Sequence, residues 1–107
     1  MTRLPTNRPP AHPGELLLEL FLEPAGLSQY KLAKETGLSY RRVNEIVKGK
    51  RGVTLDTAMR FAQFFDTTAE VWMNAQFRWD LWMFRKSKAM KEVSKIPTLT
   101  RLLAARD

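Results

Sequence analysis

Residues 28–48, which read SQYKLAKETGLSYRRVNEIVK, decide the fold of this chain. Ser28 and Ser39 are favourable N-cap residues, because a serine hydroxyl accepts a hydrogen bond from an unpaired amide in the first turn of a helix. Gly37 lies between them and can adopt the left-handed conformation that ends a helix. The stretch therefore predicts two helices of about eight or nine residues joined by a turn of roughly three, which is the spacing of a helix-turn-helix.

The second predicted helix, residues 40–48, is apolar on one side and rich in hydrogen-bonding groups on the other. Val43, Ile46 and Val47 form the side that would be buried, and the small Ala33 allows the preceding helix to cross closely. In the major groove arginine pairs with guanine and asparagine with adenine, and the first residues of such a helix reach the bases. The pattern predicts DNA binding, with base contacts from Tyr40, Arg41, Arg42, Asn44 and Glu45.

Phosphate contacts are expected on either side of these base-reading residues. The first amides of a helix have no partner within the helix and can bind a phosphate. The candidate residues at the two helix starts are Ser28, Gln29 and Ser39. The basic loop that follows supplies cations that would fix the orientation of the protein on DNA without reading sequence. The candidate residues in this loop are Lys48, Lys50 and Arg51.

The composition favours a single basic domain with a polyanionic partner. The chain has 107 residues, 44 % of them hydrophobic, and a formal net charge of +7. A chain of this length can bury a core without disulfides or metals. Residues 38–52 hold five basic residues and one acid, whereas residues 53–75 are slightly acidic. Solvated surface lysines explain the second basic stretch, residues 76–107, but they explain residues 38–52 poorly, and this favours nucleic-acid binding.

The remaining apolar spacings predict an all-α chain of three parts. Residues 1–11 are rich in proline and predict a flexible N-terminal arm. Residues 12–90 predict a five-helix domain with a long fifth helix. Residues 91–107 predict a C-terminal tail that is interrupted at Pro97 and ends in one short helix.

Three further helices complete the predicted domain. The first begins at Pro13, a residue that the first turn of a helix tolerates, and the fourth follows the N-cap Thr54. The fifth runs from Thr68 to about Ala89. Thr67 and Glu70 have the spacing of a capping box at its start.

Enzymatic chemistry finds little support in the sequence. His12 is the single histidine and precedes a helix start, where it is expected to act as a cap rather than as a base. The absence of cysteine excludes a thiol nucleophile and a thiolate metal site. No glycine-rich phosphate loop or metal-ligand cluster occurs, so we expect no catalytic residue, no cofactor and no small-molecule substrate. We also expect no signal peptide or membrane segment, and a cytoplasmic protein.

Five motifs together carry a resemblance to a known family. They are HPGE at residues 12–15, LEPAGLSQ at 22–29, RRVNEIVKGKR at 41–51, TAMR at 57–60 and WMNAQ at 72–76. With these motifs the chain resembles the HigA family of antitoxins, within the Xre-type, lambda-repressor-like helix-turn-helix superfamily. The resemblance covers about three quarters of the chain.

The resemblance implies two linked functions. Members of the HigA family are dimers that bind and neutralise a HigB toxin, a RelE-like ribonuclease that cleaves mRNA at the ribosome. They also bind palindromic operators in their own promoter, so the pair represses its own transcription. Residues 40–45 of this chain occupy the recognition-helix positions. Some relatives have the same fold without a toxin partner, so a stand-alone transcriptional regulator is the alternative.

The fifth predicted helix has two apolar stripes instead of the single stripe that docks a helix on its own domain. One stripe consists of Val71, Trp72, Ala75, Trp79, Trp82 and Met83. The other, which we assign to a homodimer interface, consists of Met73, Phe77, Leu81 and Phe84. A twofold dimer would place two recognition helices about one turn of DNA apart. Burial of both stripes within one monomer, or contact of one stripe with the toxin, are the alternatives.

RNA binding through residues 76–107 is a weaker alternative, since aromatic side chains beside lysines suit single strands. The three tryptophans, however, follow helical stripes, which is the pattern of a core or an interface.

Overall fold

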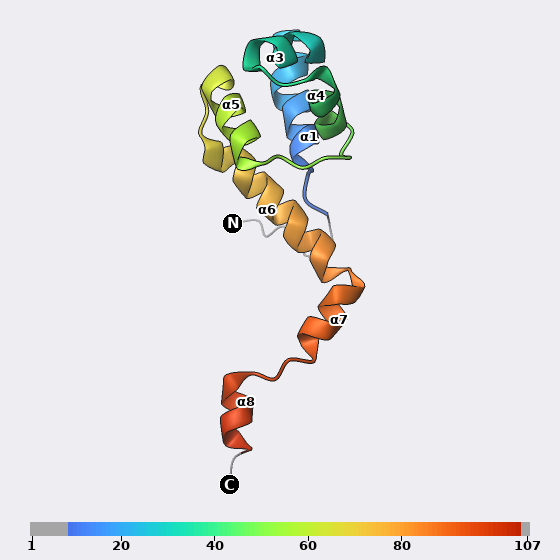
Figure 1. Cartoon of the computed structure of the whole chain (residues 1–107), viewed down its shortest axis with the longest axis vertical. Helices are drawn as coiled ribbons and strands as arrows, with labels where there is room; N and C mark the ends of the chain where they lie inside the picture. Colours follow the sequence, from blue (N-terminus) through green and yellow to red (C-terminus); the bar gives the residue numbers. More distant parts are fainter. Residues whose placement is uncertain (1–8, 106–107) are drawn as a thin grey trace, which may run out of the picture.

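The computed structural model describes residues 9–105, and these are all-helical, as predicted (Figure 1). Residues 1–8 of the predicted N-terminal arm lie outside the described residues. The elements in chain order are α1 (Pro13–Leu16), η1 (Leu17–Leu22), α2 (Glu23–Ala25), α3 (Gln29–Thr36), α4 (Tyr40–Val47), α5 (Leu55–Phe65), α6 (Ala69–Arg85), α7 (Lys88–Ser94) and α8 (Leu99–Ala104).

The first helical rod consists of α1, the π-helical η1 and α2 in succession. His12 is its N-cap, as expected, because the backbone N–H of Gly14 donates to the His12 Nδ1 at 2.9 Å. Gly14 lies against the end of α4, where an added Cβ would overlap the carbonyl oxygen of Ile46. This close approach sets the start of the first rod directly beneath the helix that was predicted to read DNA.

The predicted helix-turn-helix forms from α3 and α4. The Ser28 Oγ accepts from the backbone N–H of Lys31, and the Ser39 Oγ accepts from that of Arg42, both at 3.0 Å. Gly37 ends α3 in the left-handed region with φ of 75°. Both caps and the turn therefore lie at the predicted positions, and they fix the direction in which α4 leaves α3.

The core gathers beneath α3 and α4. Its largest fully buried side chains include Trp72 from α6, Phe61 from α5 and Leu17 from η1. The Trp72 ring lies 5.1 Å from the Phe61 ring between centroids, and its Nε1 donates to the Thr67 Oγ1 at 3.1 Å. Thr67 thus holds a buried indole, and Thr68 is the N-cap of α6 without a side-chain hydrogen bond. The predicted capping box of Thr67 and Glu70 is wrong.

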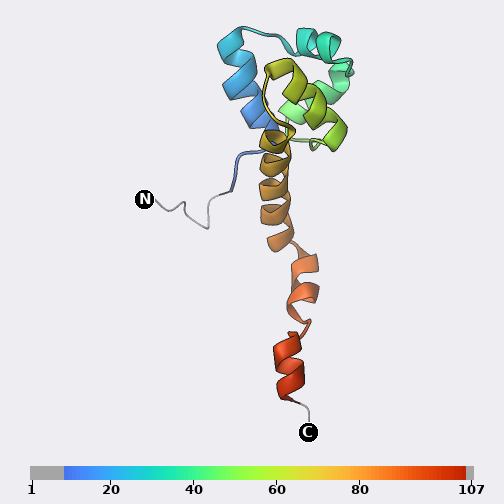
Figure 2. The same ribbon diagram turned by 90° about the vertical axis from the view of Figure 1, so that its left-hand side faces the viewer.

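The long helix α6, which corresponds to the fifth predicted helix, is shorter than predicted. It ends at Arg85, because Ser87 turns the chain: the Ser87 Oγ and N–H both donate to the Phe84 carbonyl, at 2.6 and 2.9 Å. The predicted continuation to Ala89 belongs instead to the separate helix α7. From this turn α7 and α8 project away from the domain, and the molecule extends 65 Å along its longest axis (Figure 2). No helix in the described part of the chain is long and apolar enough to cross a membrane.

Candidate nucleic-acid interface

The five predicted base-reading residues lie on or beside the outer face of α4. Val43 and Ile46 are fully buried, and this fixes which side of the helix faces outward. Tyr40 is 51 % exposed, and the side chain of Arg41 is 84 % exposed. The remaining three are half-buried at the edges of this face: Arg42, Asn44 and Glu45. We call this group of five the α4 face.

Asn44 links the α4 face to the start of α3. Its Nδ2 donates to the Gln29 Oε1 at 3.0 Å. Gln29 is the first residue of α3 and follows the cap Ser28. A candidate base reader and a candidate phosphate site are therefore held in fixed relation before any DNA is bound.

Glu45 forms ion pairs with two arginines, of which Arg41 was predicted to contact bases and Arg51 to contact phosphate. Its Oε2 lies 3.3 Å from the Arg41 Nε, and its Oε1 lies 2.9 Å from the Arg51 Nη2. Hydrogen bonds from Arg51, and then from Arg41, lower the pKa of the Glu45 carboxyl, although desolvation partly opposes them. The carboxylate is thus positioned to aim both guanidinium groups. This role of Glu45 was not predicted from the sequence, although its four-residue spacing from Arg41 is the signal of such a pair.

The basic loop after α4 folds back onto the same helix. The N–H groups of Lys50 and Arg51 donate to the Glu45 carbonyl at 2.8 and 3.2 Å. Gly49 allows this reversal with φ of 75°. Lys48 and Lys50 are exposed, so their cations lie at the margin of the α4 face.

Two residues to which the sequence assigned no individual role support this surface from behind. Gln76 of α6 is buried; its Oε1 accepts from the Val53 N–H at 2.7 Å, and its Nε2 donates to the Asp80 Oδ1 at 2.9 Å. It therefore anchors the segment that leaves the basic loop. In the sequence Gln76 appeared only as the last residue of the WMNAQ motif, with no role of its own.

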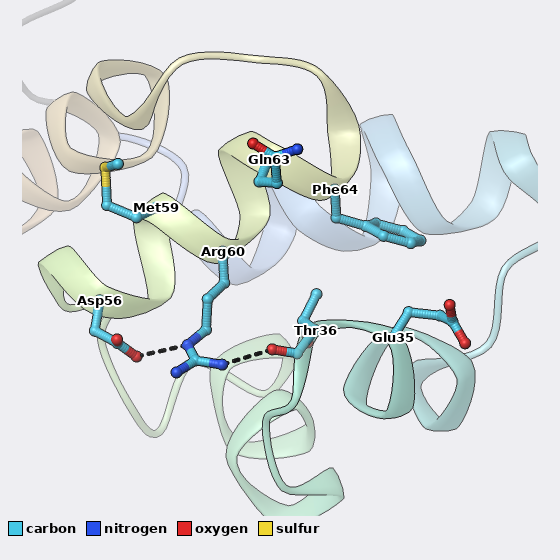
Figure 3. Close-up of a pocket in the computed structure, with 7 residues that line it drawn as sticks. All are labelled: Glu35, Thr36, Asp56, Met59, Arg60, Gln63 and Phe64. Atoms are coloured by element: carbon cyan, nitrogen blue, oxygen red, sulfur yellow. Dashed lines mark hydrogen bonds and ion pairs between the residues drawn. The ribbon is translucent and has the colours of Figure 1, made fainter.

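Arg60 is the second supporting residue. Its Nη1 donates to the Thr36 carbonyl at 2.8 Å and its Nε to the Asp56 Oδ2 at 2.9 Å (Figure 3). It caps the carboxyl end of α3 and so holds the turn before α4. The signal available in the sequence was the four-residue spacing of Asp56 and Arg60.

The two apolar stripes of α6 face different surroundings. Trp72 and Ala75 are buried, and the half-buried Trp79 stacks edge-on against His12 with ring centroids 5.1 Å apart. Val71 and Met83, predicted for the same stripe, are exposed.

The second stripe, assigned to the dimer interface, is largely open. Phe77 and Phe84 are 62 % and 46 % exposed and lie beside the half-buried Leu81. Met73 differs from them, because it packs against the domain's own core.

The described residues hold no group of three or more histidine, aspartate or glutamate side chains that could bind a metal.

Comparison with known proteins identifies similar helix-turn-helix chains. The HTH_3 family model, described as helix-turn-helix, matches residues 18–72. Virulence-associated protein I of Dichelobacter nodosus is 46 % identical over 80 residues, covering 75 % of this chain and 74 % of that protein. The uncharacterized HTH-type transcriptional regulator YbaQ of Escherichia coli is 34 % identical over 102 residues, covering 94 % and 90 %. Antitoxin HigA-1 of Vibrio cholerae is 37 % identical over 78 residues, covering 72 % of each.

Solved structures agree with these matches. The antitoxin HigA of Pseudomonas aeruginosa, solved with the higBA promoter, superposes with a TM-score of 0.79 at 36 % identity, covering 84 % of this chain and 98 % of that one. An addiction module antidote protein of the HigA family from Coxiella burnetii gives a TM-score of 0.76 at 41 % identity, covering 85 % and 98 %. The matched family model describes a helix-turn-helix, and the two solved structures are an antitoxin and an antidote protein rather than enzymes.

Proposed function

This chain belongs to the HTH_3 family of helix-turn-helix proteins, within its HigA branch, and we propose that it is an antitoxin that also represses its own operon. In this proposal the α4 face reads a palindromic operator, and the protein binds and neutralises a HigB-like, RelE-type toxin that cleaves mRNA. The likeness of almost the whole helical body to a HigA solved with promoter DNA carries the proposal. Both activities place the protein in the cytoplasm.

Readout of the operator falls to the α4 face. Arg41 is the best placed for a bidentate contact with guanine, because its side chain is almost fully open and Glu45 orients its guanidinium. Among the described residues none donates a hydrogen bond to the Asn44 amide oxygen, while the Asn44 nitrogen donates to Gln29. The phosphate grip is assigned to Ser28, Gln29, Ser39, Lys48, Lys50 and Arg51, whose contacts would position the protein without reading sequence.

A homodimer is part of the same proposal. The open stripe of Phe77, Leu81 and Phe84, with Met73 at its inner edge, supports a twofold contact between α6 helices. Such a pair presents two α4 faces to the half-sites of a palindrome. Phe77→Ser should yield a monomer in sedimentation and weaken operator binding, whereas a fully dimeric variant would reject this interface.

The second candidate function is that of a stand-alone regulator without a toxin. The match to the uncharacterized regulator YbaQ favours it, because that match covers 94 % of this chain, including the C-terminal segment. Both candidates share the DNA-reading surface, so operator binding does not separate them.

Co-purification with the product of the neighbouring gene separates the two candidates. For an antitoxin we expect a stable complex, loss of the partner's ribonuclease activity on addition of this protein, and rescue of growth when both are co-expressed. Operator binding by the free protein, measured by mobility shift on its own promoter, provides the control for folding. A protein that shifts its promoter but neither binds nor inhibits the neighbouring product would be a stand-alone regulator.

A further inference from the structure

The C-terminal arm, which we define as α7 and α8 with their connection, presents an apolar row that nothing in the described chain covers. Leu99 is 68 % exposed, and the other exposed members of the row are Val93, Ile96, Leu102 and Leu103. A helix as short as α8 is not stable in water without tertiary packing. The arm is also basic: its residues 88–104 carry four basic side chains against the single acid Glu92. The apolar row of the arm therefore requires a partner surface that is apolar and bordered by acidic side chains.

A surface of this chemistry lies over α5 and its junction with α6. Two adjoining grooves there share Met59 and Gln63, and Met59 is 57 % exposed. Figure 3 shows one of them, with Met59 and Phe64 above the Asp56–Arg60 pair. The other is lined by Asp66 and Glu70, for which the described residues supply no ion-pair partner. We call the two grooves together the α5 trough.

The arm does not reach the trough of its own chain. The two hydrogen bonds from Ser87 to the Phe84 carbonyl direct α7 away from the domain. In both views α8 lies at the opposite end of the molecule from α5 (Figures 1 and 2). An arm from another molecule meets no such obstacle.

The geometry of α6 brings a second arm to the trough. Glu70, Phe77 and Phe84 are seven residues apart and so lie along one line of this helix. An antiparallel pair of α6 helices, joined through Phe77 and Phe84, sets the start of one α7 beside Glu70 of the other copy. The arm then continues toward Asp66 and Met59.

We propose that the basic arm of one copy lies in the acidic, apolar-floored α5 trough of a second copy, with Lys91 and Lys95 facing Glu70 and Asp66. The arm thereby adds a reciprocal, charge-paired contact at each end of the α6 pair. The inference extends the dimer proposed above, but its test does not depend on DNA or toxin binding. Phe77→Ser examines the α6 contact separately.

Site-specific cross-linking tests the proposal, because the chain has no cysteine of its own. A full-length Gln63→Cys chain is co-expressed with a full-length Lys95→Cys chain and treated with a short bismaleimide. We expect a covalent dimer that neither single variant gives alone. The matched control replaces Gln63→Cys with Lys48→Cys, an exposed position at the end of α4, and should give no product. Absence of the mixed dimer, or equal product with the control, overturns the proposal.

A charge exchange supplies the second readout. Glu70→Lys added to the Gln63→Cys chain, or Lys91→Glu added to the Lys95→Cys chain, should each lower the yield of cross-linked dimer roughly fivefold, since an exposed attractive pair becomes a repulsive one. Both changes together should restore the yield. Unchanged yields, or no restoration, reject the pairing. Circular dichroism of each variant checks that the helices remain folded.

Discussion

Gln76→Ala should destabilise the protein and loosen the basic loop at the same time. The glutamine side chain is buried and accepts the Val53 N–H at 2.7 Å, 23 residues away in sequence. Alanine removes this acceptor and leaves a buried amide without a partner. An unsatisfied buried donor costs about 1–3 kcal/mol. Because Asp80 is exposed, loss of its bond from Gln76 adds little.

Urea unfolding followed by tryptophan fluorescence measures this loss. Trp72 is fully buried and reports unfolding of the core that Gln76 borders. A loss of about 2 kcal/mol with an unchanged slope lowers the urea midpoint by roughly 1 M for a protein of this size. All variants must be compared at one protein concentration, because dimerisation shifts the apparent stability.

Gln63→Ala is the matched control. Gln63 is an exposed glutamine on α5 whose side chain makes no hydrogen bond to the rest of the described chain, so its removal should change stability by less than about 0.5 kcal/mol. A midpoint for Gln76→Ala equal to the wild type would refute the role of the Val53 contact. Equal losses of stability in both variants would mean that the effect is not specific to the hydrogen bond between Gln76 and Val53. Operator affinity should fall for Gln76→Ala alone, since Val53 follows the basic loop.

Three further changes address the DNA surface and its support. Lys50→Ala should weaken specific and random DNA alike and reduce the salt slope of binding by about one unit, and an unchanged slope would exclude a phosphate contact. Arg41→Ala should relax specificity at one or two operator positions, at about 1–3 kcal/mol, which selection from a random operator library would reveal; unaltered base preference would remove Arg41 from the readers. Burial lowers the pKa of His12, although Glu15 and Asp80 partly offset the effect. Its neutral form is therefore favoured on folding, and stability that is complete above the ordinary histidine pKa is lost as pH falls below it. His12→Asn keeps a capping side chain without titrating, so thermal melts between pH 5 and 7 should then depend less on pH; an unaltered profile would assign the dependence elsewhere.

Much of the candidate site was predictable, because its signals are local. The caps Ser28 and Ser39 each act on an amide three residues away. Gly37 adopts a left-handed backbone conformation, which depends on its own residue type. The burial of Val43 and Ile46 follows from helical periodicity. Such features depend on neighbours along the chain, so the position of the helix-turn-helix and the outward face of α4 could be predicted from the sequence.

Other features depend on how the helices pack, and predictions of them from local sequence patterns were wrong. Thr67 has the residue type and spacing of a cap, yet it accepts the Trp72 indole because the core places that ring beside it. Met73 shares a helical stripe with Phe77, yet the neighbouring core covers it. Helical periodicity predicts which residues share a face of the helix. It does not predict how far along the helix the neighbouring core extends.

The sequence alone determined that this chain is all-helical and contains a helix-turn-helix, because caps, turns and apolar periodicity act over a few residues. Its five motifs separately carried the resemblance to the HigA antitoxins. Only the tertiary structure decided how that unit is braced. Asn44 meets Gln29, Val53 meets Gln76 and Thr36 meets Arg60 across 15, 23 and 24 residues. Polar pairs so distant in sequence are set by the crossing of helices, which the folded core fixes.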